Sequence, residues 1–202
     1  MEVVWAFEQG MALPPGHKGV CMQLVAYWLS IMQYAKAEND TAPAKLAASC
    51  KAEALKLQKA YGRASKDQPV GADEAVTWQL RKLRLREGVY RQCGTAAEIV
   101  RFMDEKRQGY SMGIYFNGGG GHALGFWRSG ESTGLLSRFN GHTYFFDPNV
   151  GCFKGDTSEF RSSLGAILNA VYPTCNRMEI AKVDKALEAR KHWQGAGAFR
   201  YG

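Results

Sequence analysis

The hydrophobic pattern of this chain changes near Gly109, and this change constrains the fold more than any other feature. Before it, apolar residues recur at the three- and four-residue spacing of helices with one buried face. After it come short aromatic, β-branched or apolar runs separated by Gly, Asn and Ser, at Tyr110–Phe116, Ala123–Trp127 and Thr143–Phe146. Such runs are typical of antiparallel strands. The sequence therefore predicts an α+β fold, with a helical part over about residues 20–108 and a sheet part over about residues 110–183.

Start and stop signals place the individual elements. A helix is predicted from Cys21, because apolar residues follow it at helical spacing: Leu24, Val25, Trp28, Leu29 and Met32. A second helix starts at Asp40-Thr41 and runs to about Tyr61, and its inward residues are expected to be Leu46, Cys50 and Leu57. A polar loop is expected over 62–70 and a third helix over Gly71–Gly88. Two more helices are expected, one that begins at the capping pair Thr95 and Glu98 and one that Ser158 caps. A last strand is expected over Met178–Val183.

Length and composition favour one domain of ordinary globular type. The chain has 202 residues, of which 46% are hydrophobic and 22% are charged, close to the usual proportions. We expect residues 1–202 to form a single domain. No apolar run approaches the roughly 20 residues that span a bilayer. The start Met1–Trp5 lacks the basic residues and long apolar stretch of a Sec signal.

The charge balance is positive, with 26 Lys and Arg against 19 Asp and Glu. This excess suits an anionic surface as a partner. Its members are spread over Lys45–Lys66, Arg81–Arg91 and Lys182–Arg200, where solvated helix faces explain them equally well. We therefore expect no nucleic-acid partner and leave contact with an anionic surface open.

The five cysteines stand far apart and form no CxxC pair. This spacing indicates neither a zinc site nor a dense disulfide framework, and no metal or cofactor is expected. An odd number of cysteines leaves at least one free thiol. Four of them are expected to be packed or structural: Cys50, Cys93, Cys152 and Cys175.

Three features carry candidate chemistry. Cys21 stands at the first turn of a helix, where unpaired N–H groups stabilise a thiolate. His122 ends the run Asn117–Gly121 at the mouth of a strand, and Asp147 ends an aromatic strand just before Pro148. Each feature alone has a structural explanation, as a core cysteine, a hairpin histidine and a turn former. Together they supply the thiol, the base and the orienting acid that thiol acyl transfer requires.

These residues lie in three short blocks that resemble the YopT/AvrPphB family of bacterial effector cysteine proteases (clan CA, family C58). The blocks are Gly19–Leu24 with Trp28-Leu29, His122-Ala123, and Phe145–Asn149 with Gly151 and Phe153. The resemblance implies a papain-like fold, in which the helix start that carries the nucleophile packs on a C-terminal antiparallel sheet. It implies Cys21 as nucleophile, His122 as base and acid, and Asp147 as the residue that orients the imidazole. It also implies a protein substrate in a target cell, so we expect a bacterium to secrete the chain without a Sec signal into the target-cell cytoplasm.

One departure from the papain-like pattern concerns the oxyanion hole. Papain-like enzymes usually place an Asn or Gln a few residues before the cysteine, but here that loop offers only Gly16, His17 and Lys18. Gln9 or His17 could supply the side-chain donor of the oxyanion hole instead. Loss of one such donor costs about 10²- to 10³-fold in rate.

The pairing of the strands decides whether His122 and Asp147 meet. Asn140-Gly141 is a strong hairpin signal, and a strand over Leu135–Phe139 would separate the two residues. We expect instead that 129–141 is mostly a wide connection and that 122–128 pairs directly with 143–147.

The residues leave three alternatives to a protease open. The same triad is compatible with a deamidase or transglutaminase, and with a peptidoglycan amidase toxin, because the sequence does not indicate which leaving group the thiol displaces. The missing Asn or Gln donor is compatible with an inactive papain-like binding module.

Overall fold

The structure, a computed structural model, describes residues 1–8, 20–35, 42–67, 79–117, 119–130 and 141–186. Its centre is one seven-stranded sheet in the order β1-β6-β5-β4-β3-β7-β2, and each neighbouring pair is antiparallel. The strands are β1 (Glu2–Ala6), β2 (Leu85–Cys93), β3 (Gln108–Phe116), β4 (Gly121–Arg128), β5 (His142–Asp147), β6 (Gly151–Asp156) and β7 (Cys175–Lys185).

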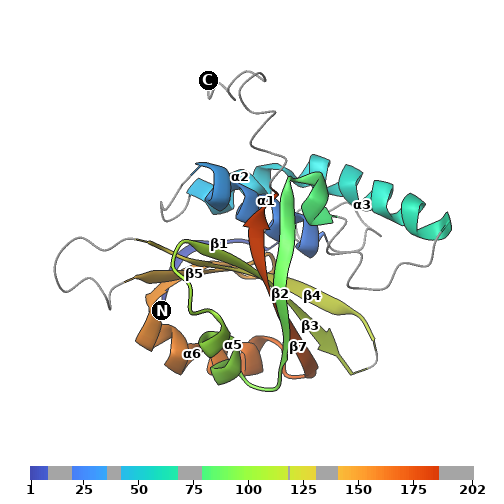
Figure 1. Cartoon of the computed structure of the whole chain (residues 1–202). Helices are drawn as coiled ribbons and strands as arrows, with labels where there is room; N and C mark the ends of the chain where they lie inside the picture. Colours follow the sequence, from blue (N-terminus) through green and yellow to red (C-terminus); the bar gives the residue numbers. More distant parts are fainter. Residues whose placement is uncertain (9–19, 36–41, 68–78, 118, 131–140, 187–202) are drawn as a thin grey trace.

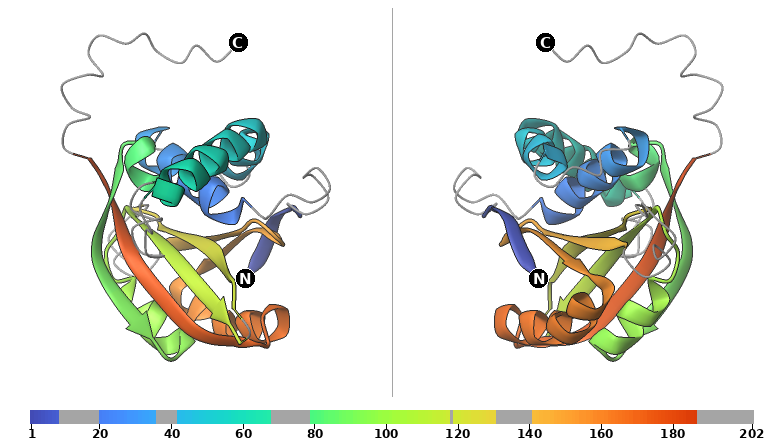
Figure 2. Two further views of the ribbon diagram at one scale, coloured as in Figure 1. Left: turned by 90° about the vertical axis from the view of Figure 1, so that its right-hand side faces the viewer. Right: turned by 90° about the vertical axis from the view of Figure 1, so that its left-hand side faces the viewer.

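Helices cover both faces of this sheet (Figures 1 and 2). On one face lie α1 (Cys21–Ala35), α2 (Ala42–Ser49) and α3 (Lys51–Asp67), and on the other lie α5 (Ala96–Phe102) and α6 (Thr157–Val171). No helix in the described part of the chain is both long and apolar enough to span a membrane.

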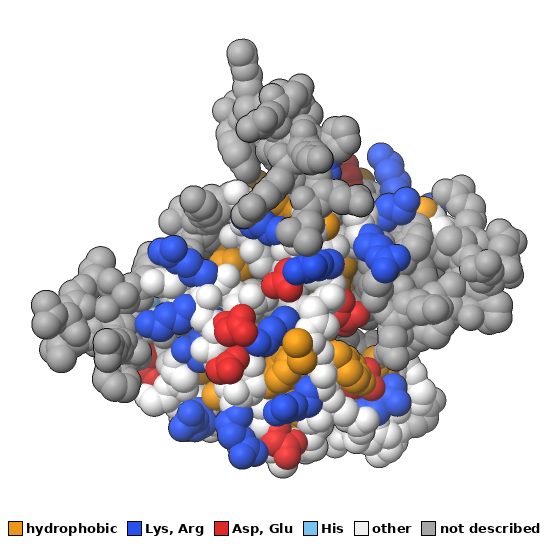
Figure 3. All heavy atoms as spheres, viewed as in Figure 1, with side chains coloured by type: hydrophobic (Ala, Val, Ile, Leu, Met, Phe, Trp, Pro, Cys, Tyr) orange, Lys and Arg blue, Asp and Glu red, His pale blue; other side chains and the backbone are white. Residues whose placement is uncertain are grey.

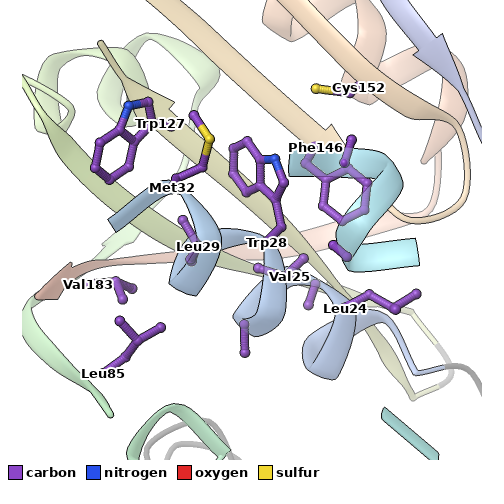
Figure 4. Close-up of a cluster of buried hydrophobic side chains, with 14 of the residues drawn as sticks. Leu24, Val25, Trp28, Leu29, Met32, Leu85, Trp127, Phe146, Cys152 and Val183 are labelled. Carbon is purple, nitrogen blue, oxygen red and sulfur yellow. The ribbon is translucent and has the colours of Figure 1, made fainter. Parts of the chain in front are cut away.

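The core between α1 and the sheet depends on one close approach, at Gly125 of β4. A Cβ built on Gly125 would lie 2.8 Å from the Trp28 ring, so only a glycine admits the indole at this place. Trp28 is 1% exposed, and its ring centroid lies 5.5 Å from that of Phe146 on β5. Leu24, Leu29 and Met32 complete this side of the helix (Figure 4). The contact fixes α1 across the sheet, with Cys21 at its first turn.

The opposite core is built on aromatic rings. Phe126 and Phe145, on neighbouring strands, stack at 5.1 Å, and Phe160 of α6 meets both rings edge-on. The alternation along β4 and β5 thus fills both faces of the sheet, which explains why these strands read as nearly continuous apolar runs.

Several sequence predictions are confirmed. The first helix begins at Cys21, and Thr95 and Glu98 form the capping box of α5. The four expected strands lie within β3, β4, β5 and β7. Strands β4 and β5 pair directly, as expected, from Gly125 opposite Phe146 to Arg128 opposite Thr143. Residues 131–140 of the expected wide connection lie outside the described residues.

The expected third helix is wrong at its C-terminal end. After a helical turn at residues 79–82, Arg84 adopts a positive φ of 58°, and the chain then continues as β2. Strand β2 is an edge strand, in which Val89 and Tyr90 are 63% and 47% exposed. A strand exposed at an edge has no clear alternation of polar and apolar residues, so the sequence pattern of residues 85–93 did not indicate a strand. The first residues of the expected third helix, Gly71–Trp78, lie outside the described residues.

The second expected helix is interrupted at Cys50 and is longer than predicted. Helix α3 continues to Asp67, through most of the expected loop at 62–70. Leu46 is exposed, and Cys50 and Leu57 are only half-buried. Small residues face the core instead, namely Pro43, Ala44, Ala47 and Ala48. Small side chains let two helices approach closely, so alanine rather than leucine marks the buried side of α2 here.

Three further corrections concern caps and edges. Asp156, not Ser158, caps α6, and its carboxylate accepts the backbone N–H groups of Ser158 and Glu159. Strands β1 and β6 were not expected; β1 and β2 make the N-terminal half less helical than predicted, and β6 adds a strand to the C-terminal half.

Candidate active site

Cys21 lies at the N-terminal turn of α1, beside the start of β4. Its sulfur is hydrogen-bonded by the His122 side chain and by the backbone N–H groups of Ala123 and Met22. Burial alone would raise the pKa of the thiol, but these donors and the charge of His122 outweigh it and hold the pKa below its ordinary value. The site therefore favours a thiolate.

His122 lies at the second residue of β4 and is 7% exposed. Its Nε2 lies 2.8 Å from Oδ1 of Asp147, which leaves Nδ1 for Cys21. Burial lowers the pKa of the imidazole, but the hydrogen bonds and charges of Asp147 and Cys21 raise it further, to about 9. The site thus favours an imidazolium between two anions.

Asp147 is the last residue of β5 and is 0% exposed. Since β4 and β5 are antiparallel neighbours, the end of β5 meets the start of β4, and this brings the carboxylate to His122. Oδ1 of Asp147 also accepts the backbone N–H of Asn149, at 2.8 Å. The turn after Asp147 closes at Gly151, whose φ of 135° favours glycine. The Asp-Pro-Asn sequence is therefore both a turn and a holder of the carboxylate.

Tyr172 is a site residue that the sequence did not indicate. Its hydroxyl donates to Oδ2 of Asp147 at 2.7 Å, and its ring centroid lies 5.3 Å from that of His122. Burial and the charge of Asp147 raise the pKa of this phenol, so it stays a donor. Tyr172 caps the C-terminal end of α6, 25 residues after Asp147, and nothing in the local sequence links the two.

A cavity of about 210 Å³ lies beside Cys21 and His122. Strands β3, β4 and β7 line it with small residues, Ser111, Gly113, Ala123 and Ala181, and with larger ones such as Tyr115 and Ile180. Glu87 and Tyr90 of β2 and the preceding Gln79 form part of its wall. The nucleophile candidate thus faces a space that a peptide segment can enter.

The other candidates of the sequence analysis fall outside this cluster. Gln9 and His17, the alternatives for the oxyanion hole, lie outside the described residues. Cys93 and Cys152 are buried, as expected, whereas Cys175 is half-buried. Burial raises the pKa of both Cys50 and Cys93. Among the described residues, no group of three His, Cys, Asp or Glu side chains is placed to hold a metal ion.

The basic residues do not form a continuous patch on the face shown in Figure 3, where blue and red side chains are interleaved. Some of the basic residues are held in ion pairs, such as Arg86 with Asp184 at 3.8 Å and Arg177 with Glu179 at 3.3 Å. This face gives no support to an anionic partner.

The described residues thus define a class: a mixed helical and antiparallel-sheet protein with a thiol, an imidazole and a carboxylate joined at one end of the sheet. Among solved structures, the chain is similar to the Pseudomonas avirulence protein AvrPphB, with a TM-score of 0.65. The match covers 83% of this chain and 93% of that one, at 15% sequence identity. No protein-family model matches the chain, and no curated protein matches it. The likeness shows a shared fold.

Proposed function

We propose that this chain is a papain-like cysteine protease of the bacterial effector type, which cleaves a specific protein. The observation that carries the proposal is the hydrogen-bonded row Cys21–His122–Asp147 at a helix start beside a cavity. The AvrPphB-like fold supports the same class. The roles are nucleophile for Cys21, base and acid for His122, and orienting acid for Asp147.

The chemistry follows from the geometry. The Cys21 thiolate adds to the scissile carbonyl carbon, and the helix start supplies backbone N–H groups near the developing oxyanion. His122 protonates the leaving amine, the C–N bond breaks, and an acyl-thioester remains on Cys21. His122, now neutral, takes a proton from a water that attacks the thioester, which releases the acid and restores the thiolate. Asp147 keeps Nδ1 of the ring toward the sulfur and stabilises the imidazolium.

The biological setting is part of the proposal. We place the chain among proteins that a bacterium exports, with its substrate in the cytoplasm of the target cell. The fold shared with an avirulence protein of Pseudomonas supports this setting.

The test of the proposed function is mass spectrometry of target-cell proteins incubated with the wild-type chain or with Cys21→Ala. New peptide termini that appear only with the wild type support a protease. Conversion of Gln to Glu without new termini means a deamidase, and release of peptidoglycan fragments means an amidase. No Cys21-dependent product of any kind would mean a binding module.

The activity is expected to fall as the pH rises through about 9, the pKa of His122. Above this pH the imidazole is neutral and can no longer protonate the leaving amine. On the acid side, activity falls only below the lowered pKa of Cys21, where the thiolate is protonated. The measurement is kcat/KM on an identified peptide from pH 5 to pH 10. An alkaline limb near 6.5, the pKa of an unperturbed histidine, would contradict the pairing of His122 with Asp147.

Tyr172→Phe is expected to lower kcat by about 10-fold with little change in KM, because it removes one hydrogen bond from the carboxylate that orients His122. The ring stays, so the packing against His122 remains. Tyr172 is thus a positioning residue, and the pH profile of the variant should show a displaced alkaline limb. Tyr144→Phe, in the core between α1 and the sheet, is the control and should leave that limb in place. An unchanged profile in both variants would assign Tyr172 to packing alone.

A further inference from the structure

Gln79 has a buried carboxamide oxygen without a hydrogen-bond partner. The residue is 4% exposed, and its Oε1 makes no hydrogen bond within the described structure. Gln108 is a useful comparison, since it is also buried, at 8%, but donates to the carbonyl oxygens of Gly109 and Val183 at 2.9 Å each. A buried polar atom without a partner destabilises a folded protein, and such an atom calls for an explanation.

The place of Gln79 supplies the explanation. It lines the cavity that also contains Cys21 and His122. Small residues, Gly113 and Ala123 among them, also line this cavity, so a peptide main chain can lie close to the sheet beside them. The terminal torsion of a glutamine side chain is broad, and a modest rotation turns its oxygen toward a ligand.

We infer that Gln79 is a substrate-binding residue, whose carboxamide oxygen accepts a hydrogen bond from a main-chain N–H of an extended peptide in this cavity. The inference rests on the proposed function and adds to it the group that holds the peptide. A main-chain N–H is present at every residue except proline, so this contact selects extended peptides without selecting a side chain. The missing partner in the free protein is then supplied by the substrate.

The experiment compares two alkylating reagents on Cys21. In both, the sulfur attacks the CH₂ carbon of a chloromethyl ketone, a C–S bond forms, the C–Cl bond breaks and chloride leaves. Chloroacetone carries no peptide, whereas acetyl-tripeptide chloromethyl ketones, varied at the residue next to the ketone, present a main chain to the cavity. Alkylation of Cys21 is followed by mass spectrometry of its peptide.

Gln79→Met is the main variant, because methionine keeps the length of the side chain and removes its polar atoms. We expect it to slow the reaction with the fastest tripeptide reagent by about 3- to 10-fold and to leave the rate with chloroacetone unchanged. We also expect its Tm to rise by about 2 to 4 °C, because an unpaired buried oxygen is removed. Gln79→Leu should give the same result with a different packing.

Gln108→Met is the matched control. It removes a buried glutamine that is already hydrogen-bonded, so its Tm should fall, and the ratio of the two alkylation rates should stay at the wild-type value.

The remaining outcomes separate the inference from the proposed function. Equal slowing with both reagents, a fall in Tm for Gln79→Met, or a wild type in which no tripeptide reagent reacts faster than chloroacetone would each overturn the role of Gln79. Alkylation of Cys21 by chloroacetone no faster than that of Cys50 would instead overturn the proposed nucleophile.

Discussion

Cys21→Ala is expected to lose on the order of 10⁴-fold or more of the activity on an identified substrate, because the thiol that hydrogen-bonds with His122 and forms the acyl-thioester is removed. Cys21 is only half-buried, so its replacement removes little packing, and the variant should melt within a few degrees of the wild type. The measurements are initial rates and a thermal melt on the same preparation.

His122→Ala is expected to lose nearly as much, since the thiolate loses its ion-pair partner and the leaving amine loses its acid. Full activity in this variant would rule out the mechanism. The other described histidine, His142, lies at the far end of β5, and His142→Ala is the control that should keep normal activity.

Asp147 should be replaced by asparagine rather than alanine. Its carboxylate is fully buried and accepts hydrogen bonds from His122, Asn149 and Tyr172. Alanine would leave buried donors unpaired, at a cost of about 1–3 kcal/mol for each, and would confound activity with unfolding. Asp147→Asn keeps the shape of the side chain. We expect a smaller loss than in His122→Ala, because the acid orients the base without exchanging protons with substrate.

The three candidate catalytic residues could be predicted from the sequence because each one stands in a local sequence pattern. Cys21 follows a loop and opens a strongly periodic helix, and His122 and Asp147 sit at strand ends beside Gly and Pro. Their meeting depended on β4 and β5 being neighbours, as expected from the direct pairing of 122–128 with 143–147.

The rest depends on contacts between distant segments. Tyr172 reaches Asp147 from the end of another helix, and Gln79 reaches the cavity from a short turn before an edge strand. Neither position differs locally from an ordinary surface residue. The edge strands β1 and β2 were missed for a related reason, since their side chains meet one partner strand and much solvent, and the pattern that marks a strand needs a buried face.

Trp28→Ala is expected to cost about 3–5 kcal/mol of unfolding free energy, a large part of the roughly 5–15 kcal/mol that holds a typical domain together. The indole is 1% exposed and lies between the Gly125 backbone and the Phe146 ring, so its removal leaves a cavity where α1 crosses the sheet. Urea titration of the wild type and of Trp28→Ala gives the difference in the free energy of unfolding.

The same variant tests how the fold positions the candidate nucleophile. Helix α1 carries Cys21 at one end and Trp28 two turns further on, so a helix that shifts on the sheet moves the sulfur away from His122. We therefore expect Cys21 in Trp28→Ala to lose its reactivity toward chloroacetone near neutral pH, even below the urea concentration that unfolds the protein. Trp28→Phe is the control, because a phenyl ring still fills much of the space beside Phe146 and should keep most of both the stability and the reactivity. A Trp28→Ala protein that is destabilised but keeps a fully reactive Cys21 would mean that the helix start is held by its own contacts with β4, the hydrogen bonds from His122 and Ala123, and not by the tryptophan.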